Sequence, residues 1–555
     1  INGLASDMPV DRASEYWPAS IAADPRTFIL RNIKGGMVPS ASVRVIGTWD
    51  RNDNVDLTAL TGEIEVRGTS VDYVTGMPKA MNVDGTATFN KSQFNIQVTR
   101  GEAGGVILRE GRVLFTDLEK VDQFADIELL VGGSMRAGLA VANHPPLEFA
   151  KELEIEPETV QGEFDAALKL NFIAEKDLTM DGVKIEARAT LRDLSVPGVA
   201  FRSEVTDGDF ELTANQDRLE MRGTAKIDTV TTEIDWRMDF DETNPIESRF
   251  KLVSELNDTQ RARLMGLEGA PFSPEFMTGP AKVNATVERF RDGRGRVSAD
   301  FVLDEMALAI PHFGWAKKPG VAATAHIAAD LTNHAVTGIP AFSVSGAGLT
   351  VRGSAVFDGT TPSKIMLDKF AFGGTDVAGV IIPQAQGWDM DLRGPKLDFN
   401  PWLEEESVEQ EDARPARPIT LSLNVDRVQL DKGQYVKNVS GALFYDGLLW
   451  KKIDLRANLD GGQPIHLDMR PENGRRLVKM TSEDAGAALR ALGYYQNMVG
   501  GKLDLQGTYE DGLPGRPLKG TVRVSNFRVV KAPLMARVLS LAALTGFLEA
   551  LTGEG

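Results

Sequence analysis

Strict alternation of apolar and polar residues is the feature that most constrains how this 555-residue chain can fold. Between Leu219 and Asp228, apolar or small residues occupy every odd position and polar residues every even position. The same period of two recurs at 164–172, 185–191, 419–426 and 465–470. Because successive side chains of a strand point to opposite faces, this period predicts antiparallel strands with one apolar and one solvated face.

Aspartate–glycine pairs separate many of these runs. They occur at Asp207-Gly208, Asp292-Gly293, Asp358-Gly359, Asp446-Gly447 and Asp460-Gly461. Such pairs suit tight hairpin turns because glycine accepts positive φ. Together the runs and turns predict a mainly β chain with about 20–25 strands.

Four segments carry helical signals, near 13–33, 257–267, 482–498 and 533–551. We expect Ser482 to cap the third helix. In the fourth, Arg537 and Glu549 interrupt an apolar stretch that is shorter than the roughly 20 residues of a membrane span. Packing of that helix against the sheet is favoured over a position on a lipid-filled groove.

An acidic block followed by prolines marks the main predicted domain boundary. Six of the nine residues from Glu404 to Asp412 are acidic, and prolines follow as far as Pro418. A block of like charge cannot bury itself, so residues 404–418 are expected to form a solvated loop or linker. The chain is also too long for one compact core, which usually stops growing near roughly 250–300 residues. We therefore expect one region at 1–403 and a second at 419–555.

Residue types that carry chemistry are sparse. The chain has no cysteine, and its five histidines, His144, His312, His326, His334 and His466, form no zinc-type pair. It also lacks a Walker-type phosphate loop, a dinucleotide glycine pattern and a Gly-x-Ser-x-Gly elbow. We expect no enzymatic activity, no metal and no cofactor. The net charge of −18 disfavours a nucleic-acid partner and broad adhesion to anionic lipid headgroups.

The apolar face that the alternation predicts must be covered by something. A sandwich with a protein core, a closed barrel and a curled trough covered by another molecule all satisfy the pattern. Bulky residues such as Phe164 and Phe210 would fill a sandwich and would equally line a trough. The candidate residues of this face are Ile64, Val66, Phe164, Leu168, Leu170, Phe172, Ile185, Leu191, Phe210, Leu212, Leu219, Met221, Phe250, Leu252, Phe301, Leu303, Leu421, Leu423, Val425, Ile465, Leu467 and Met469.

Short motifs spread along the chain resemble a known family. Near the start they are Tyr16-Trp17-Pro18, Arg26, Phe28, Asn32-Ile33 and Gly35-Gly36. In the middle they are Asn257-Asp258, Arg261 to Leu264, Gly266-Leu267, Gly279-Pro280 and Phe313 to Gly320. These segments are similar to those of YhdP-type AsmA-like proteins. Further segments resemble the AsmA-like C-terminal region, namely Leu397-Asp398, Pro401 to Leu403, Thr481 to Gly486, Tyr494 to Gly501, Gly520 and Ala532 to Gly546.

The resemblance to this family, which includes YhdP- and TamB-type bridge-like lipid transfer proteins, implies a fold and a function. The implied fold is an elongated, curled antiparallel trough, or β-taco, with a few short helices. Residues 1–403 would form its YhdP-type groove region and residues 419–555 a truncated AsmA-like C-terminal region. The implied function is a non-enzymatic conduit that carries phospholipid or other acyl lipid along an apolar groove between the inner and outer membranes.

The same resemblance implies a place in the cell. The protein would be periplasmic in a Gram-negative bacterium, and an N-terminal segment outside this chain would anchor it in the inner membrane. Because the chain begins at Ile1 rather than Met, we expect it to be a piece of a longer protein whose remaining segments contact the membranes. The sequence indicates no particular protein partner.

Two other functions stay open at this point. The first is a structural or assembly factor for outer-membrane proteins, with a protein-filled β-sandwich core. The second is a glycan-acting or other hydrolytic β-protein, which the absence of a recognisable active-site motif disfavours. Bound phospholipid in the purified protein would distinguish a conduit from an assembly factor.

Overall fold

The computed structural model describes residues 1–17, 23–49, 55–145, 155–174, 182–200, 203–265, 273–310, 314–333, 335–359, 361–400, 417–431, 433–513 and 516–530. Strands make up 70% of the structure and helices 9%, which confirms the predicted mainly β class with a curled antiparallel sheet and few short helices. The predicted helix at 533–551 and nearly all of the predicted linker at 404–418 lie outside the described residues.

The strands form two sheets, and the chain divides into two compact units. Within the described ranges, one sheet has 29 strands, and a second sheet consists of the three short strands β15, β18 and β19. Unit 1 comprises Ile1–Glu255 and Glu288–Asp292, and unit 2 comprises Leu256–Val287 and Gly293–Gly555. This division lies far from the predicted boundary at 404–418.

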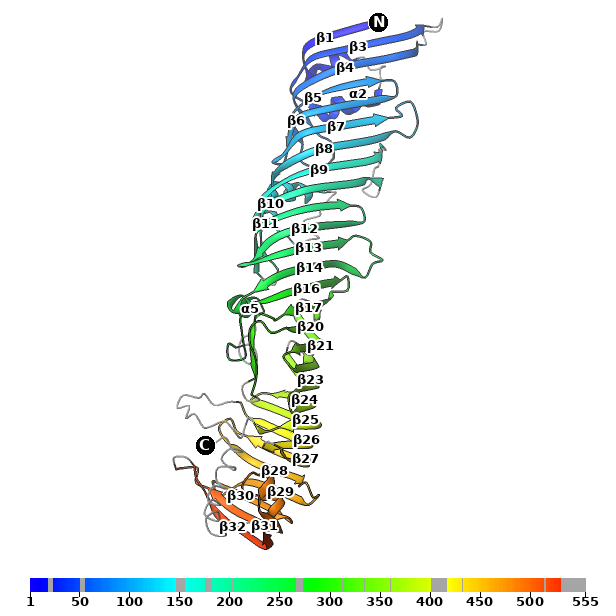
Figure 1. Cartoon of the computed structure of the whole chain (residues 1–555). Coiled ribbons are helices and arrows are strands. Elements are labelled where there is room, and N and C mark those ends of the chain that lie inside the picture. Colours follow the sequence, from blue (N-terminus) through cyan, green and yellow to red (C-terminus); the bar gives the residue numbers. More distant parts are fainter. Residues whose placement is uncertain are drawn as a thin grey trace. The chain divides into compact units, whose positions relative to one another are not determined.

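Unit 1 is built from consecutive antiparallel strands. From β3 onward, neighbours in the chain are neighbours in the sheet, as Figure 1 shows, while β1 pairs with the opposite edge of β3. Its strands are β1 (Asn2–Pro9), β2 (Ile33–Lys34), β3 (Met37–Trp49), β4 (Val55–Val71), β5 (Ala80–Asn90), β6 (Gln93–Ala103), β7 (Val106–Thr116), β8 (Phe124–Ser134), β9 (Gln161–Ile173), β10 (Lys184–Ala200), β11 (Ser203–Asn215), β12 (Arg218–Ile227), β13 (Val230–Asp239) and β14 (Ile246–Leu256).

Unit 2 continues the same strand pattern with one parallel step. Strands β25 and β26, which flank the predicted acidic linker, pair in parallel. The remaining strands of the chain are β15 (Met277–Thr278), β16 (Ala281–Phe290), β17 (Arg294–Val302), β18 (Ala307–Ile310), β19 (Trp315–Lys317), β20 (Ala323–Thr332), β21 (Ala335–Gly346), β22 (Leu349–Asp358), β23 (Thr361–Phe372), β24 (Thr375–Gln384), β25 (Gly387–Asp398), β26 (Ile419–Asp431), β27 (Gln434–Tyr445), β28 (Trp450–Asn458), β29 (Pro464–Glu472), β30 (Arg475–Ser482), β31 (Met498–Tyr509) and β32 (Leu518–Val529).

The helices are shorter than the sequence predicts. Where 13–33 was expected to be one helix, the described residues contain α1 and α2, and β2 begins at Ile33. None of the described helices is long and apolar enough to cross a membrane. The helical elements are α1 (Ala13–Tyr16), α2 (Ala23–Asn32), α3 (Met135–Ala142), α5 (Asp258–Met265), α7 (Ala485–Ala491) and the 3₁₀ turns η1 (Val10–Arg12) and η2 (Pro157–Thr159).

Helix α7 also differs from the prediction at its N-terminus. Ser482 is not its cap, because this residue ends strand β30 and its hydroxyl donates to the carbonyl of Pro464 at 3.1 Å. The cap is Asp484, whose carboxylate accepts the amide of Ala487 at 2.9 Å. After the helix, Gly493 adopts a positive φ of 74°, which suits glycine and redirects the chain toward β31.

One predicted turn is a bulge inside a strand. Four of the aspartate–glycine pairs lie between consecutive strands, as predicted. Asp207 and Gly208 instead lie within β11, where Asp207 has a φ of 50° and the register against β12 shifts. A comparable shift follows Leu191 in β10, with Asp193 at a φ of 51°. Such bulges bend a strand, which accounts for the curl of the sheet in unit 1.

Candidate functional site

Antiparallel pairing places the predicted apolar residues of unit 1 in rows that cross the strands. In the first row, Leu212 of β11 faces Ala189 of β10 and Met221 of β12. The row continues through Trp236 of β13 to Phe250 of β14. The rings of Trp236 and Phe250 stack with their centroids 5.5 Å apart. Register partners project from the same face, so this row forms a continuous apolar strip.

A second row runs beside the first. Leu191 of β10 faces Phe164 of β9 and Phe210 of β11, and further along Leu252 of β14 faces Ile234 of β13. Leu191, Phe210 and Ile234 are buried, whereas Phe164 and Leu252 are only half-buried. This side of the face therefore has a packed margin as well as accessible apolar surface.

A third row extends toward the N-terminal strands. Ile185 of β10 faces Leu170 of β9, and Leu170 faces Ile127 of β8. The row then crosses β7, β6, β5 and β4 through Val113, Ile96, Ala87 and Ile64. One line of apolar side chains therefore passes over seven consecutive strands.

The other predicted residues of unit 1 lie on the same face. Their register partners are Leu129 and Ala187 for Leu168, Ala125 for Phe172, Ala214 and Met238 for Leu219, and Gly85 for Val66. Apart from the buried pair Leu191 and Phe210, every predicted unit 1 residue is half-buried. We call this set, with its row partners, the apolar face of unit 1.

Strand β13 adds residues that the prediction missed. Val230, Ile234, Trp236 and Met238 occupy alternate positions, and all but Trp236 are buried. The alternation of this strand, which includes Thr232 between Val230 and Ile234, was a signal that could have identified Trp236 and Ile234. The indole nitrogen of Trp236 is buried without a hydrogen-bond acceptor.

The opposite face of the same strands carries matched charges. Lys169 of β9 donates to its register partner Glu128 of β8 at 2.8 Å. Arg222 of β12 lies 3.3 Å from its register partner Asp235 of β13. The hydrogen bond from Lys169 holds the pKa of Glu128 below its ordinary value. Cross-strand pairs of opposite charge support the same register that builds the apolar face.

Helix α3 lies against one margin of the apolar face. A Cβ atom at Gly138 would come within 2.6 Å of the ring of Phe164, so only glycine lets the helix approach that side chain. The hydroxyl of Ser134 caps the helix by accepting the amide of Ala137 at 3.2 Å. The helix therefore borders the face at the row that begins with Phe164.

In unit 2, the corresponding apolar residues pack into protein clusters. Phe301 and Leu303 belong to a cluster formed with the three-stranded sheet, in which Met306, Leu308 and Trp315 are buried. Leu303 is 8% exposed. The side chains of this second sheet thus cover the apolar side of the main sheet here.

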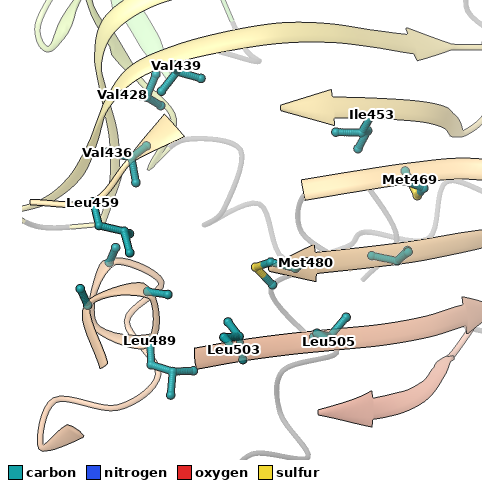
Figure 2. Packing of buried hydrophobic residues seen from close by; sticks show 14 of the residues in the cluster. Val428, Val436, Val439, Ile453, Leu459, Met469, Met480, Leu489, Leu503 and Leu505 are labelled. Carbon is teal, nitrogen blue, oxygen red and sulfur yellow. The ribbon is translucent and has the colours of Figure 1, made fainter. Parts of the chain in front are cut away.

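The remaining candidates belong to a larger cluster around α7. Val425 and Met469 are buried at its centre, and Leu421, Leu423, Ile465 and Leu467 pack against it. Figure 2 shows Leu489 of α7 close to Leu503 of β31 and Met480 of β30. Gly486 lets the helix lie against β31, because a Cβ there would come within 2.3 Å of the Met498 carbonyl. In this region of unit 2, the apolar side of the strands forms a wall of a protein core.

The described histidines lie apart from one another. His326 shares a 2.8 Å hydrogen bond with Asp300, and His466 shares one of 2.8 Å with Asp454. His144 is exposed, and His312 and His334 lie outside the described residues. No group of three metal-ligating side chains is found in the described part of the chain.

Comparison with protein families now decides what kind of protein this is. The family model of the YhdP protein matches residues 1–507 of the 555. The chain belongs to the YhdP family. Membership of this AsmA-like family indicates an envelope-associated role. No curated protein and no solved structure matches the chain significantly.

The YhdP match spans every described strand before β31 and all but the last two residues of β31. It includes the apolar face of unit 1, the cluster with the three-stranded sheet and most of the cluster around α7. Motifs that suggested the family have structural roles. Trp315 and Lys317 belong to β19 of the three-stranded sheet, and Asp258 and Arg261 bond Gly279 next to β15. Asp484 caps α7.

Proposed function

We propose that the apolar face of unit 1 binds the acyl chains of phospholipids or similar lipids, and that the protein is a non-enzymatic lipid conduit of the bacterial envelope. The observation that carries this proposal is the set of half-buried apolar rows, which cross successive strands without a break. In keeping with the family, the conduit would lie in the periplasm and connect the inner and outer membranes.

The energetics favour a surface of this kind. Each methylene group removed from water contributes about 0.8 kcal/mol, so a 16-carbon chain exposed to water costs about 12 kcal/mol. A continuous apolar row removes most of that cost at every position along the path. It also offers no deep minimum that would trap the lipid, because successive strands present similar side chains. The charged opposite face keeps the sheet solvated.

A glutamate in the first row tests the proposal directly. Leu212 is half-buried between Ala189 and Met221 on the apolar face, whereas Thr213 is exposed on the opposite face of the same strand. We expect Leu212→Glu to abolish most crosslinking of a photoactivatable phospholipid to β10–β13, because an unpaired carboxylate in an apolar setting is costly. Thr213→Glu should leave crosslinking unchanged, since adjacent residues of a strand face opposite sides.

Melting curves for both variants accompany the crosslinking. A folded Leu212→Glu protein that still crosslinks lipid along these strands would contradict the proposal. Native mass spectrometry of the unmodified protein provides a second measurement. We expect the purified protein to retain phospholipid. Protein that carries no lipid after gentle purification would favour the alternative of a structural or assembly factor, which the packed clusters of unit 2 also fit.

A further inference from the structure

The three-stranded sheet occupies part of the apolar face of unit 2. Below it, Phe301 of β17 begins a row that continues across β20, β21, β22 and β23 through Ala325, Val344, Val351 and Phe370. These residues pack against a cluster that includes Met306, Leu308 and Trp315. We call β15, β18 and β19 the cover. The cover supplies apolar side chains over this row of unit 2, whereas the rows of unit 1 keep accessible surface.

The cover is a separate sheet with few strand residues. Its pairings join β15 to β18 and β18 to β19, and the described strands of the main sheet do not include it. The indole nitrogen of Trp315 donates to the carbonyl of Ala347, in the turn between β21 and β22, at 3.1 Å. Apart from such polar contacts, apolar packing holds the cover in place.

Lys317 links β19 of the cover to the segment that joins β17 and β18. Its ammonium is buried, with the side chain 2% exposed, and donates to the carbonyls of Asp304 at 2.9 Å and Met306 at 2.7 Å. Asp304 in turn accepts the amide of Ala323 at 3.0 Å, which links this turn to the start of β20. Burial lowers the pKa of the Lys317 ammonium, while Asp304 and Glu305 act in the opposite direction.

A second attachment holds the other end of the cover. The Asp258 carboxylate of α5 accepts the amide of Gly279 at 3.0 Å, next to β15. Arg261, which is 7% exposed, donates to the Gly279 carbonyl at 3.0 Å and to Asp258 at 2.5 Å. The cover is therefore fixed at both ends by charge-assisted hydrogen bonds, which are stronger than neutral ones.

We infer that the cover is a displaceable plug that occupies the acyl-chain path of unit 2, and that Lys317 holds it closed. This inference rests on the proposed lipid-binding function of unit 1. An acyl chain that replaced the cover would bury the same apolar row again, which offsets the cost of uncovering that row. The polar attachments then decide how often the path is open, because breaking them leaves buried carbonyls without donors.

Adduct mapping with a photoactivatable phospholipid tests the inference on the full chain. The lipid carries a diazirine in one acyl chain, is supplied in phosphatidylcholine vesicles, and its adducts are located by mass spectrometry. In the unmodified protein we expect adducts on β9–β14 and few on β20–β23. Lys317→Met keeps an apolar stem but removes the donors, and should raise adducts on β20–β23 about tenfold. Lys318→Met changes the exposed neighbour in the same way and should have no effect.

A milder variant keeps the test valid if Lys317→Met does not fold. Trp315→Phe keeps an aromatic ring in the cluster but removes the hydrogen bond to the Ala347 carbonyl. We expect it to raise the adducts on β20–β23 about threefold. The melting temperature should stay close to that of the unmodified protein. Folded variants with unchanged adducts on β20–β23 would overturn the plug. So would heavy labelling of β20–β23 in the unmodified protein. Absence of adducts from β9–β14 in every variant would instead overturn the proposed function of unit 1.

Discussion

Arg476 shows how a single residue is kept charged inside an apolar cluster. It is 1% exposed, and its guanidinium donates to both carboxylate oxygens of Asp511, at distances from 2.6 to 3.1 Å. It also donates to the carbonyl of Trp450 and lies 4.2 Å from the centre of the Tyr509 ring. These contacts tie the start of β30 to β28 and β31, which form one wall of the C-terminal cluster.

Removing this guanidinium should destabilise the protein strongly. Arg476→Met leaves the Asp511 carboxylate without its cation, and breaking a buried pair in this way typically costs roughly 3–5 kcal/mol. Arg475→Met makes the same change at the exposed neighbouring residue and should alter the free energy of unfolding by less than about 0.5 kcal/mol. Urea denaturation of both variants measures the difference. Equal effects at the two positions would show that the buried pair contributes no specific stability.

At the scale of elements, strands with the same alternation of apolar and polar residues lie in two different environments. Leu212 in β11 and Leu423 in β26 have similar sequence surroundings, and both are half-buried. Leu423, however, packs against the cluster that α7 closes, and its partners are Leu392 and Gly441. Whether an apolar strand face is packed inside a protein core or stays accessible therefore depends on elements that come from elsewhere in the chain.

This difference predicts opposite behaviour for the same substitution. Leu423→Glu buries an unpaired carboxylate in a packed cluster and should lower the free energy of unfolding by a few kcal/mol. Asn424→Glu, on the exposed face of the same strand, should be nearly neutral. Chemical denaturation monitored by tryptophan fluorescence provides the measurement. If Leu423→Glu is as stable as Asn424→Glu, this cluster is not a protein core.

The alternation predicted the strands and the orientation of their side chains, because a period of two is a local property. It could not predict the cover, whose strands have two to four residues and are too short to show a period. It also misassigned Asp207-Gly208, since a bulge and a turn both need a residue at positive φ. Helix α7 proved shorter than predicted because the chain turns at Gly493, which has a positive φ of 74°, before β31 begins at Met498.

At the scale of the whole molecule, the sheet grows mainly by adding antiparallel neighbours in chain order. Each addition needs only a short connection and a matching register, so the apolar rows lengthen with every strand. Such a construction specifies a long surface rather than one pocket.

The net charge of −18 leads to a prediction about how lipid would reach the proposed binding surface. A negative protein should approach neutral phosphatidylcholine vesicles more readily than vesicles that also contain phosphatidylglycerol. At about 0.1 M salt the Debye length is about 10 Å, so the repulsion slows uptake of a fluorescent lipid from the anionic vesicles. At about 1 M salt it shrinks to about 3 Å, and the two rates should converge. Uptake that is faster from anionic vesicles at low salt would show that a local basic surface, rather than the net charge, controls the encounter.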